Sequence, residues 1–228
     1  MLNNIKNVLI FAAHHDDETI GCAGTIKKLS EMGCKITVVF ATDGATGIDH
    51  TRIYEKKIVS TREKESEKVK NLLGVSKTLN WRVPCQQLTY TQKLMQKALR
   101  TIRIEKPDLI ITHSVIEKHS DHQSLSKIVT QAAWKASEDI LPNLGETHKV
   151  QDVWCYEVVD VLGKIDYCVD ITDQFKFKIQ AMKLYSSQEN VVTGILSFIE
   201  GLAMIRGYSI GVKYAEAFKR IAIQPVKL

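Results

Sequence analysis

A short apolar run that leads directly into a cluster of charged side chains constrains the fold of this chain more than any other feature. The run, Val8–Phe11, is typical of a buried strand. The cluster that follows, His14–Glu18, contains two histidines and three carboxylates. Residues 19–26 after it include two glycines and are typical of the start of a helix. In α/β proteins, ligands bind outside the carboxyl ends of the strands. The cluster therefore occupies the position where such a fold has its functional site.

The spacing within this cluster favours a metal site. His14 and Asp17 are three residues apart, so a bend between strand and helix can bring both to one ion. Imidazole nitrogen and carboxylate oxygen are both zinc ligands. Asp16 lies between them and is available to take a proton from a metal-bound water. Because a catalytic zinc ion has about three protein ligands and one open position, the cluster predicts a third ligand, a histidine at the end of another strand.

The order of strand and helix signals predicts an α/β fold, with a Rossmann-like, mostly parallel sheet flanked by helices in a single domain. Residues 1–135 alternate strands with helices, which indicates βαβ units. Residues 136–228 are expected to extend the sheet or form a small hairpin, and to add a C-terminal helical part. The expected strands are 8–11, 35–41, 78–83, 108–113, 153–158 and 167–171, and the expected helices are 19–32, 54–73, 91–105 and 176–186.

The apolar stretch 190–208 is open to three interpretations. It contains three glycines, Gly194, Gly201 and Gly207. A mobile flap over a substrate, a contact between subunits and an ordinary core helix are all compatible with this pattern.

The loop after the expected strand 108–113 holds the partner for the first cluster. Residues 113–122 contain three histidines and two acidic residues. If the two strands are neighbours, His122 completes a His-Asp-His site with the first cluster. His119 then lies beside the metal as an acid or base. Asp121 is placed to hold the imidazole of His119, as the carboxylate does in a catalytic triad.

Composition and charge argue against several classes of function. The net charge of +5 is mild and the basic residues are scattered, so no nucleic-acid partner is expected. No stretch approaches about 18 apolar residues, so neither a membrane span nor a signal peptide is expected. The five cysteines include no CxxC pair, which favours a reduced, cytoplasmic protein over a disulfide scaffold or a thiolate zinc site.

These motifs resemble those of the PIG-L / LmbE-like family of zinc-dependent deacetylases, which act on N-acetylglucosaminyl compounds and related amides. Residues 13–18 are similar to the family motif Ala-His-Pro-Asp-Asp-Glu, and residues 119–122 are similar to His-Pro-Asp-His. Weaker similarity extends over nearly the whole chain, at residues 21–24, 42–44, 62–63, 185–188 and 214–218.

The resemblance implies a role for each matching residue. The metal ligands of the family match His14, Asp17 and His122. Asp16 matches the general base, and His119 matches the histidine that acts as an acid or stabilises the oxyanion, with Asp121 tuning it. Arg62 matches an arginine that contacts the sugar, which suits a cation beside hydroxyl or phosphate oxygens.

The implied reaction is removal of the N-acetyl group from an amino-sugar conjugate, with release of acetate. The implied cofactor is Zn²⁺, and a set of two histidines and one carboxylate also suits Fe²⁺. The implied partners are a small amino-sugar substrate and, because many relatives form homo-oligomers, further copies of the chain.

Four residues depart from the family pattern. Ala23 stands where the family has glycine, and Glu117, just before the second motif, stands where it has aspartate, which is a mild change. His15 stands where the family has proline, which frees the turn and adds a competing ligand, although adjacent side chains of an extended chain point apart. Cys85 follows Val83 and Pro84 where aspartate is common in the family. A plain loop thiol is the favoured interpretation of Cys85.

Two other functions stay open. A metal-dependent amidase for a non-sugar substrate needs the same ligands and differs only in its pocket. A non-enzymatic α/β binding module has less support, because no G-x-G-x-x-G follows the first strand and the pair Asp16 and His119 would have no purpose. Metal content distinguishes the module from the two enzymes, and activity on N-acetylglucosaminides distinguishes the enzymes from each other.

Overall fold

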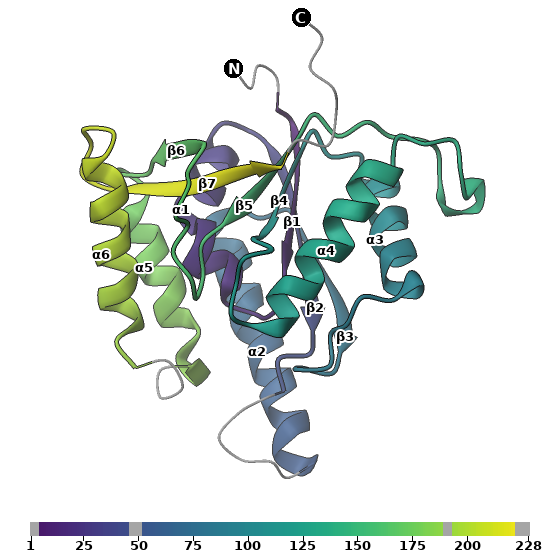
Figure 1. Ribbon diagram of the computed structural model, residues 1–228. Helices are drawn as coiled ribbons and strands as arrows, with labels where there is room; N and C mark the ends of the chain where they lie inside the picture. The colour runs from purple at the N-terminus through teal and green to yellow at the C-terminus, as the bar shows by residue number, and fades with distance from the viewer. Residues whose placement is uncertain (1–4, 46–51, 189–192, 222–228) are drawn as a thin grey trace, which may run out of the picture.

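A seven-stranded sheet runs through the computed structural model, which describes residues 5–45, 52–188 and 193–221 (Figure 1). The strands lie in the order β3-β2-β1-β4-β5-β7-β6. β1 to β5 pair in parallel, and β7 runs antiparallel to both β5 and β6. Their bounds are β1 Asn7–Ala12, β2 Lys35–Thr42, β3 Lys77–Val83, β4 Leu109–His113, β5 Asp152–Tyr156, β6 Tyr167–Asp170 and β7 Ala215–Ile221.

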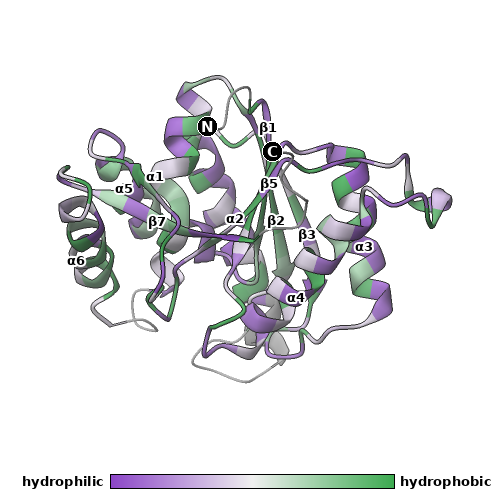
Figure 2. Cartoon of the chain, turned by 45° about the horizontal axis from the view of Figure 1, so that its top comes forward, coloured by the Kyte–Doolittle hydropathy of each residue, from purple (hydrophilic) through white to green (hydrophobic). Residues whose placement is uncertain are grey.

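Helices cover both faces of this sheet. α3 (Gln92–Glu105) and α4 (Ser120–Lys135) pack on one face. The helices on the opposite face are α1 (Asp17–Glu31), α2 (Arg52–Leu73), α5 (Phe175–Leu184) and α6 (Ile195–Tyr208). Short 3₁₀ turns occupy Pro142–Leu144 and Ser186–Gln188. In Figure 2 the central strands are green, as a sheet buried between two layers requires, while the helices around it carry both purple and green and α6 is largely green.

The alternation of side chains along β1 explains how one strand serves two cores. Leu9 and Phe11 point into the core formed with α3 and α4, while Val8 and Ile10 point into the core formed with α1, α2 and α5. Successive side chains of a strand point to opposite faces, so a strand that is buried on both faces is apolar at every position. The run 8–11 has this composition.

The position of β1 in the sheet creates the crevice that holds the site. β1 pairs with β2 on one side and with β4 on the other. The chain leaves β1 toward β2 and β3, and then crosses to β4 on the far side. This reversal of strand order is a topological switch point, where ligands bind at the carboxyl ends of the strands. The loops after β1 and β4 are therefore adjacent.

The α/β fold class with its mostly parallel, Rossmann-like sheet is confirmed, and the C-terminal part does extend the sheet. One strand was not expected. β7 lies between β5 and β6, so the strands 153–158 and 167–171 are not direct neighbours. The helix expected at 176–186 ends at Leu184, and the stretch 190–208 forms α6 from Ile195 onward. Residues 190–192 of that stretch lie outside the described residues.

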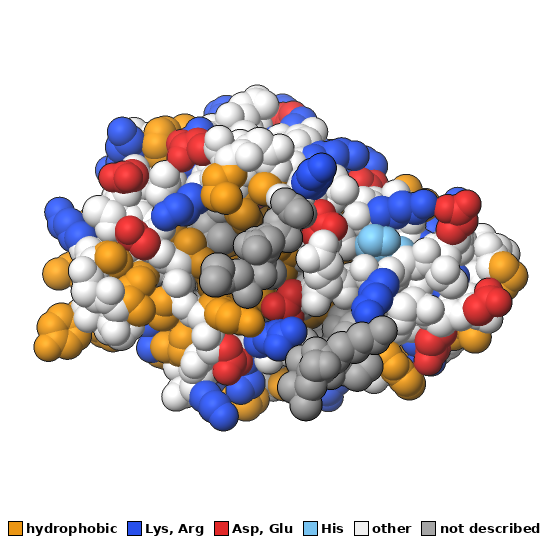
Figure 3. All heavy atoms as spheres, turned by 90° about the horizontal axis from the view of Figure 1, so that it is seen from above, with side chains coloured by type: hydrophobic (Ala, Val, Ile, Leu, Met, Phe, Trp, Pro, Cys, Tyr) orange, Lys and Arg blue, Asp and Glu red, His pale blue; other side chains and the backbone are white. Residues whose placement is uncertain are grey.

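The surface agrees with the scattered charge of the sequence. Figure 3 shows basic and acidic side chains interspersed over the visible face, with apolar side chains at the left edge, on the side where Figure 1 places α6. Four large apolar residues in and just after α6 are exposed: Met204, Ile205, Tyr208 and Ile210. Within the described parts of the chain, none of the helices has the combination of length and hydropathy needed to cross a membrane.

Candidate active site

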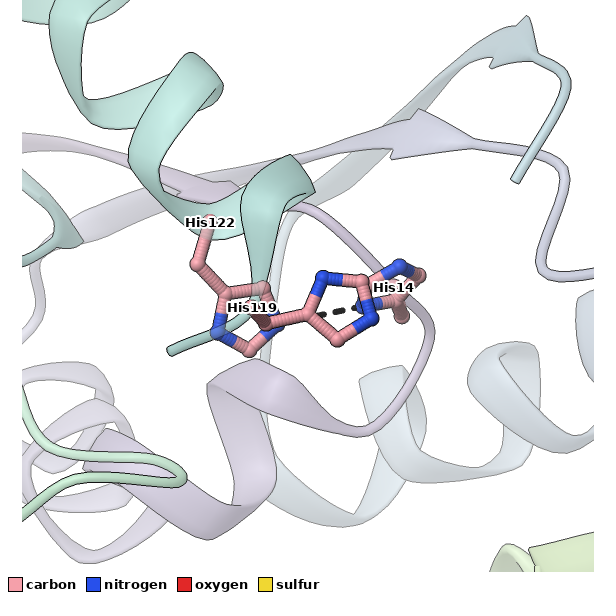
Figure 4. A group of neighbouring side chains, drawn as sticks. All are labelled: His14, His119 and His122. Carbon is pink, nitrogen blue, oxygen red and sulfur yellow. Dashed lines mark hydrogen bonds between the residues drawn. The ribbon is translucent and has the colours of Figure 1, made fainter. Parts of the chain in front are cut away.

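The loops after β1 and β4 bring the two sequence clusters together. Ile10 of β1 pairs with Ile111 of β4, so the two strands are direct neighbours. His14 follows β1, and His122 lies in the first turn of α4. Figure 4 shows the rings of His14, His119 and His122 gathered together, with a contact between His14 and His122 behind the ring of His119.

His14 Nδ1, His122 Nε2 and the Asp17 carboxylate form a triangle of potential ligand groups, in which each ring nitrogen lies closest to a different oxygen of Asp17. His14 Nδ1 lies 3.2 Å from His122 Nε2 and 3.3 Å from Asp17 Oδ2. His122 Nε2 lies 3.4 Å from Asp17 Oδ1. Ligand atoms bound to one tetrahedral zinc ion at about 2.0–2.1 Å are about 3.3 Å from each other. The spacing of these three side chains therefore fits a single ion.

Two buried carboxylates fix the orientation of the two histidines. His14 Nε2 is 3.0 Å from Asp121 Oδ2, and His122 Nδ1 is 2.6 Å from Glu117 Oε2. An ionised carboxylate only accepts hydrogen bonds, so each ring donates its N–H outward. The opposite nitrogens then present lone pairs to the space between the two rings and the Asp17 carboxylate, where a cation would lie. Metal-binding histidines are commonly held in this way, and the donor set fits a divalent cation.

The electrostatics of this triangle favour positive charge. Burial disfavours protonation of His122, but the carboxylates of Asp17 and Glu117 outweigh it and raise the pKa of His122 to about 9. Burial is likewise outweighed at His14, where Asp17 and Asp121 raise the pKa well above its usual value. Carboxylates that attract protons to these rings also attract a metal ion.

Asp16 occupies a strained position at the edge of the triangle. Its φ of 136° lies in a region that non-glycine residues rarely adopt, and its carbonyl accepts from the N–H of Thr19 and Ile20 at the start of α1. The carboxylate of Asp16 lines the cavity above the site. Burial raises the pKa of Asp16 to about 6, although the neighbouring Arg62 guanidinium lowers it.

Arg62 binds Asp16 directly. Its Nη2 donates to Asp16 Oδ2 at 3.1 Å, and its Nη1 donates to the carbonyl of Gly44 at 3.1 Å. A Cβ at Gly44 would lie 2.8 Å from Arg62 Nη1, so glycine is needed there for this close approach. Arg62 also lines the cavity. Its contact with a sugar stays a prediction.

His119 lies at the entrance to α4, and its ring lies edge-on to the ring of His14 with their centroids 4.7 Å apart. His119 Nδ1 accepts from the backbone N–H of Asp121 at 3.2 Å, so Nε2 is the nitrogen that carries a proton to donate. The Asp121 carboxylate was expected to hold this ring. It contacts His14 instead, because it is turned inward and accepts from the backbone N–H of Gln86 and Leu88.

Two of the departures from the family pattern, His15 and Cys85, have different surroundings. The His15 ring stacks on Phe40 of β2, with centroids 4.3 Å apart, and is not part of the triangle. Cys85 is buried, with Sγ 4.0 Å from Asp121 Oδ2. Cys85 is thus a thiol of the loop after β3 that lies beside the group that orients His14.

Sequence reasoning missed three residues that support the site. Glu117 holds His122, and His113 stacks on the same ring with centroids 4.0 Å apart. Glu18 accepts from the N–H of Asp16 at 3.2 Å and from the Tyr185 hydroxyl at 2.8 Å. Glu18 lies in the first turn of α1, His113 ends β4, and Glu117 lies in the loop after β4. Their roles depend on contacts that spacing along the sequence does not reveal.

A cavity of about 470 Å³ opens above the triangle. Its size falls in the range of small-molecule sites. The described residues that line it are His14, Asp16, Asp17, Ile20, Arg62, His119, His122, Val158, Val159, Gln188, Thr193, Ile195 and Phe198.

Comparison with known families identifies the chain. The model of the PIG-L family, described as GlcNAc-PI de-N-acetylase, matches residues 9–133, which include both clusters. The chain belongs to the PIG-L family. The matched residues 9–133 include His14, Asp17 and His122, so the family match covers the whole triangle.

Two deacetylases are similar to this chain over nearly its whole length. A diacetylchitobiose deacetylase of Thermococcus kodakarensis is 28% identical over 95% of this chain and 84% of its own length. The structure of an N,N'-diacetylchitobiose deacetylase from Pyrococcus horikoshii in complex with an inhibitor superposes with a TM-score of 0.87 at 28% identity, covering 96% of this chain and 85% of the other.

The same fold also occurs in a protein named for a different reaction. The 4-carboxy-2-hydroxymuconate hydratase GalB from Pseudomonas putida superposes with a TM-score of 0.84 at 18% identity, covering 98% of this chain and 99% of the other. Fold alone therefore does not assign a reaction to a PIG-L member, and function has to be argued from the site.

Proposed function

We propose that this PIG-L family member is a metal-dependent hydrolase that removes the N-acetyl group from an N-acetylglucosaminyl or related amino-sugar conjugate. The observation that carries the proposal is the triangle of His14 Nδ1, His122 Nε2 and the Asp17 carboxylate at the base of a cavity. The deacetylase names of the relatives support the substrate class.

The proposed metal ligands are His14, Asp17 and His122, with Asp121 and Glu117 orienting the two rings. Zinc is the proposed ion, and Fe²⁺ suits the same donor set. When bound, such an ion lowers the pKa of a water from about 16 toward about 7 and polarises a carbonyl group.

Asp16 is the proposed general base. Its carboxylate faces the cavity beside the triangle, and a base works best when its pKa is near the working pH. Asp16 takes a proton from the attacking water as the oxygen forms a bond to the acetyl carbon. Arg62 and Glu18 hold Asp16 in place from two sides, through its carboxylate and its backbone N–H.

His119 is the proposed acid. Its Nδ1 is occupied by the N–H of Asp121, so Nε2–H is the group that stabilises the oxyanion and protonates the leaving nitrogen. The C–N bond then breaks, and acetate and a free amine leave. A metal-dependent amidase for a non-sugar substrate would use the same residues, and only its substrate would differ.

Acetate release from a panel of N-acetylglucosaminyl compounds and simple acetamides tests the proposal. We expect release from the sugars, loss of release with a chelator, and a decrease of about 10²-fold or more in Asp16→Asn, the scale of general-base catalysis. Asp173→Asn is the matched control, because Asp173 is exposed and does not line the cavity.

The alternatives give different results in the same assay. Release from the acetamides only, with one bound metal ion per chain, would identify the non-sugar amidase. Absence of bound metal after incubation with zinc or Fe²⁺ would overturn both enzymes.

A further inference from the structure

The residues that line the cavity above the triangle fall into two chemically different sets. One set, which we call the apolar wall, consists of aliphatic and aromatic side chains from α1, from the loop after β5 and from the first turn of α6: Ile20, Val158, Val159, Ile195 and Phe198. The other set, which we call the polar side, includes Arg62 of α2 and Gln188 of the turn after α5.

The apolar wall is attached to the metal ligands through Glu117. Glu117 Oε2 accepts from His122, while Oε1 accepts from the backbone N–H of Asp160 at 2.6 Å. Asp160 directly follows Val158 and Val159, so one carboxylate fixes both the ligand and this part of the wall.

A second contact joins the two halves of the wall. Arg206 of α6 donates from Nε to Glu157 Oε2 at 3.2 Å, and Glu157 immediately precedes Val158. The helix that carries Ile195 and Phe198 is thereby tied to the loop after β5. Because a partly buried hydrogen bond and a partly buried ion pair hold the two halves, the wall is formed before any ligand binds.

The polar side has little capacity for an anionic group. Arg62 is the one lysine or arginine among the described lining residues, and its guanidinium is already bound to Asp16 and to the Gly44 carbonyl. Among these described residues, a carboxylate or phosphate would thus lose its hydration without gaining a lysine or arginine that is not already paired.

We infer that the conjugate attached to the N-acetylated sugar is an uncharged apolar aglycone, such as an alkyl chain, which packs on the apolar wall. This inference rests on the proposed deacetylase function. The hydroxyl groups of a second sugar would find no hydrogen-bonding side chain on the wall and would be left unpaired, whereas an alkyl chain is stabilised by removal from water.

A series of N-acetylglucosaminides with methyl, butyl and hexyl aglycones tests the inference, each prepared as both anomers. Diacetylchitobiose and the N-acetylglucosaminyl conjugate of L-malate complete the set, and acetate release is the readout. We expect kcat/KM to rise at least about 10-fold from the methyl to the butyl compound. Each methylene that is fully buried can contribute about fourfold, so the three added methylenes set an upper limit of roughly 60-fold. We expect both chitobiose and the malate conjugate to fall below the butyl compound.

Two variants of α6 locate the effect on the wall. In Phe198→Ala we expect the butyl-to-methyl ratio of kcat/KM to fall at least about threefold, because part of the wall is removed. Ile205→Ala is the matched control, since Ile205 lies on the same helix, is 64% exposed and does not line the cavity. Its ratio should equal that of the unmodified protein.

The outcomes separate the inference from the function on which it rests. Acetate release from every compound with a flat or falling alkyl series, or a preference for chitobiose or the malate conjugate, would overturn the apolar aglycone and leave the deacetylase intact. An equal fall of the ratio in both variants would also overturn it. Release from none of the compounds would overturn the deacetylase and this inference together.

Discussion

At the residue scale, the contact between Arg62 and Asp16 determines how the proposed base ionises. The guanidinium lies 3.1 Å from the carboxylate and stabilises its charged form inside a buried site. Burial acts in the opposite direction, and the balance raises the pKa of Asp16 to about 6. A base must lose its proton before it can accept one, so this pKa sets the acidic limit of activity.

Replacement of Arg62 should shift that limit. In Arg62→Met the carboxylate loses its cation, so the pKa of Asp16 rises further and the acidic limb of kcat/KM moves to higher pH. We expect a loss of about 10-fold or more at neutral pH, which is less than the roughly 10²–10⁴-fold that loss of the general base itself would cost. Arg62→Lys should retain part of the effect, because the charge remains while the two-point contact is lost.

The pH profile also separates the two roles available to Arg62. If Arg62 contacts the sugar and does not tune Asp16, KM rises and the acidic limb stays in place. That pattern would contradict the assignment of Arg62 as a residue that positions the base.

At the element scale, α1 depends on a carboxylate from the opposite end of the chain. α1 is interrupted at Cys22, where φ is −150°. The first backbone N–H groups of its second segment therefore need an acceptor from outside the helix. Glu216 of β7 accepts from the N–H of Gly24 at 2.9 Å and of Thr25 at 2.7 Å. Lys178 of α5 donates to the same carboxylate at 2.6 Å, which balances its charge in the core.

Removal of this carboxylate should destabilise the protein strongly. Glu216→Ala leaves Lys178 buried without a partner, and breaking a buried ion pair costs about 3–5 kcal/mol. We expect this loss in the free energy of unfolding, measured with a chemical denaturant.

A double variant tests the physical reason for that loss. Glu216→Gln combined with Lys178→Met removes both charges, so it should be less destabilising than Glu216→Ala. Equal losses in the two proteins would mean that the unpaired lysine is not the cause.

The same region shows what the sequence can and cannot predict. The strands that carry the site are uniformly apolar, because both faces of the sheet are covered, and they were recognised by that composition. β7 was missed, since it contains Glu216, Lys219 and Arg220 and resembles an exposed segment. The partners that make Glu216 a core residue lie 38 and about 190 positions away in the chain.

The site, too, has features that the sequence predicts and features that it does not. The grouping of His14, Asp17 and His122 was predictable from two clusters and the expectation that their strands are neighbours. The choice of His14 over His119 as the partner of Asp121 was not, because it depends on the direction in which one side chain turns. Sequence spacing limits which residues can meet and leaves their orientations undetermined.

At the scale of the whole molecule, the proposed metal ion joins the two halves of the sheet. His14 and Asp17 follow β1, while His122 belongs to the helix after β4. An ion bound by all three would hold the loops after β1 and β4 together across the switch point. A ligand that binds only the folded state stabilises it by mass action.

Metal binding should therefore raise the melting temperature. At a free zinc concentration about 100-fold above Kd the stabilisation is about 2.7 kcal/mol, which for a chain of this length corresponds to roughly 5–10 °C. Differential scanning calorimetry with zinc and with a chelator measures the shift. Asp17→Asn should lose it, because a neutral amide replaces the charged ligand, while Asp173→Asn at an exposed position should keep it. A shift that survives in Asp17→Asn would mean that the stabilising ion binds elsewhere, and the triangle would then not be the metal site.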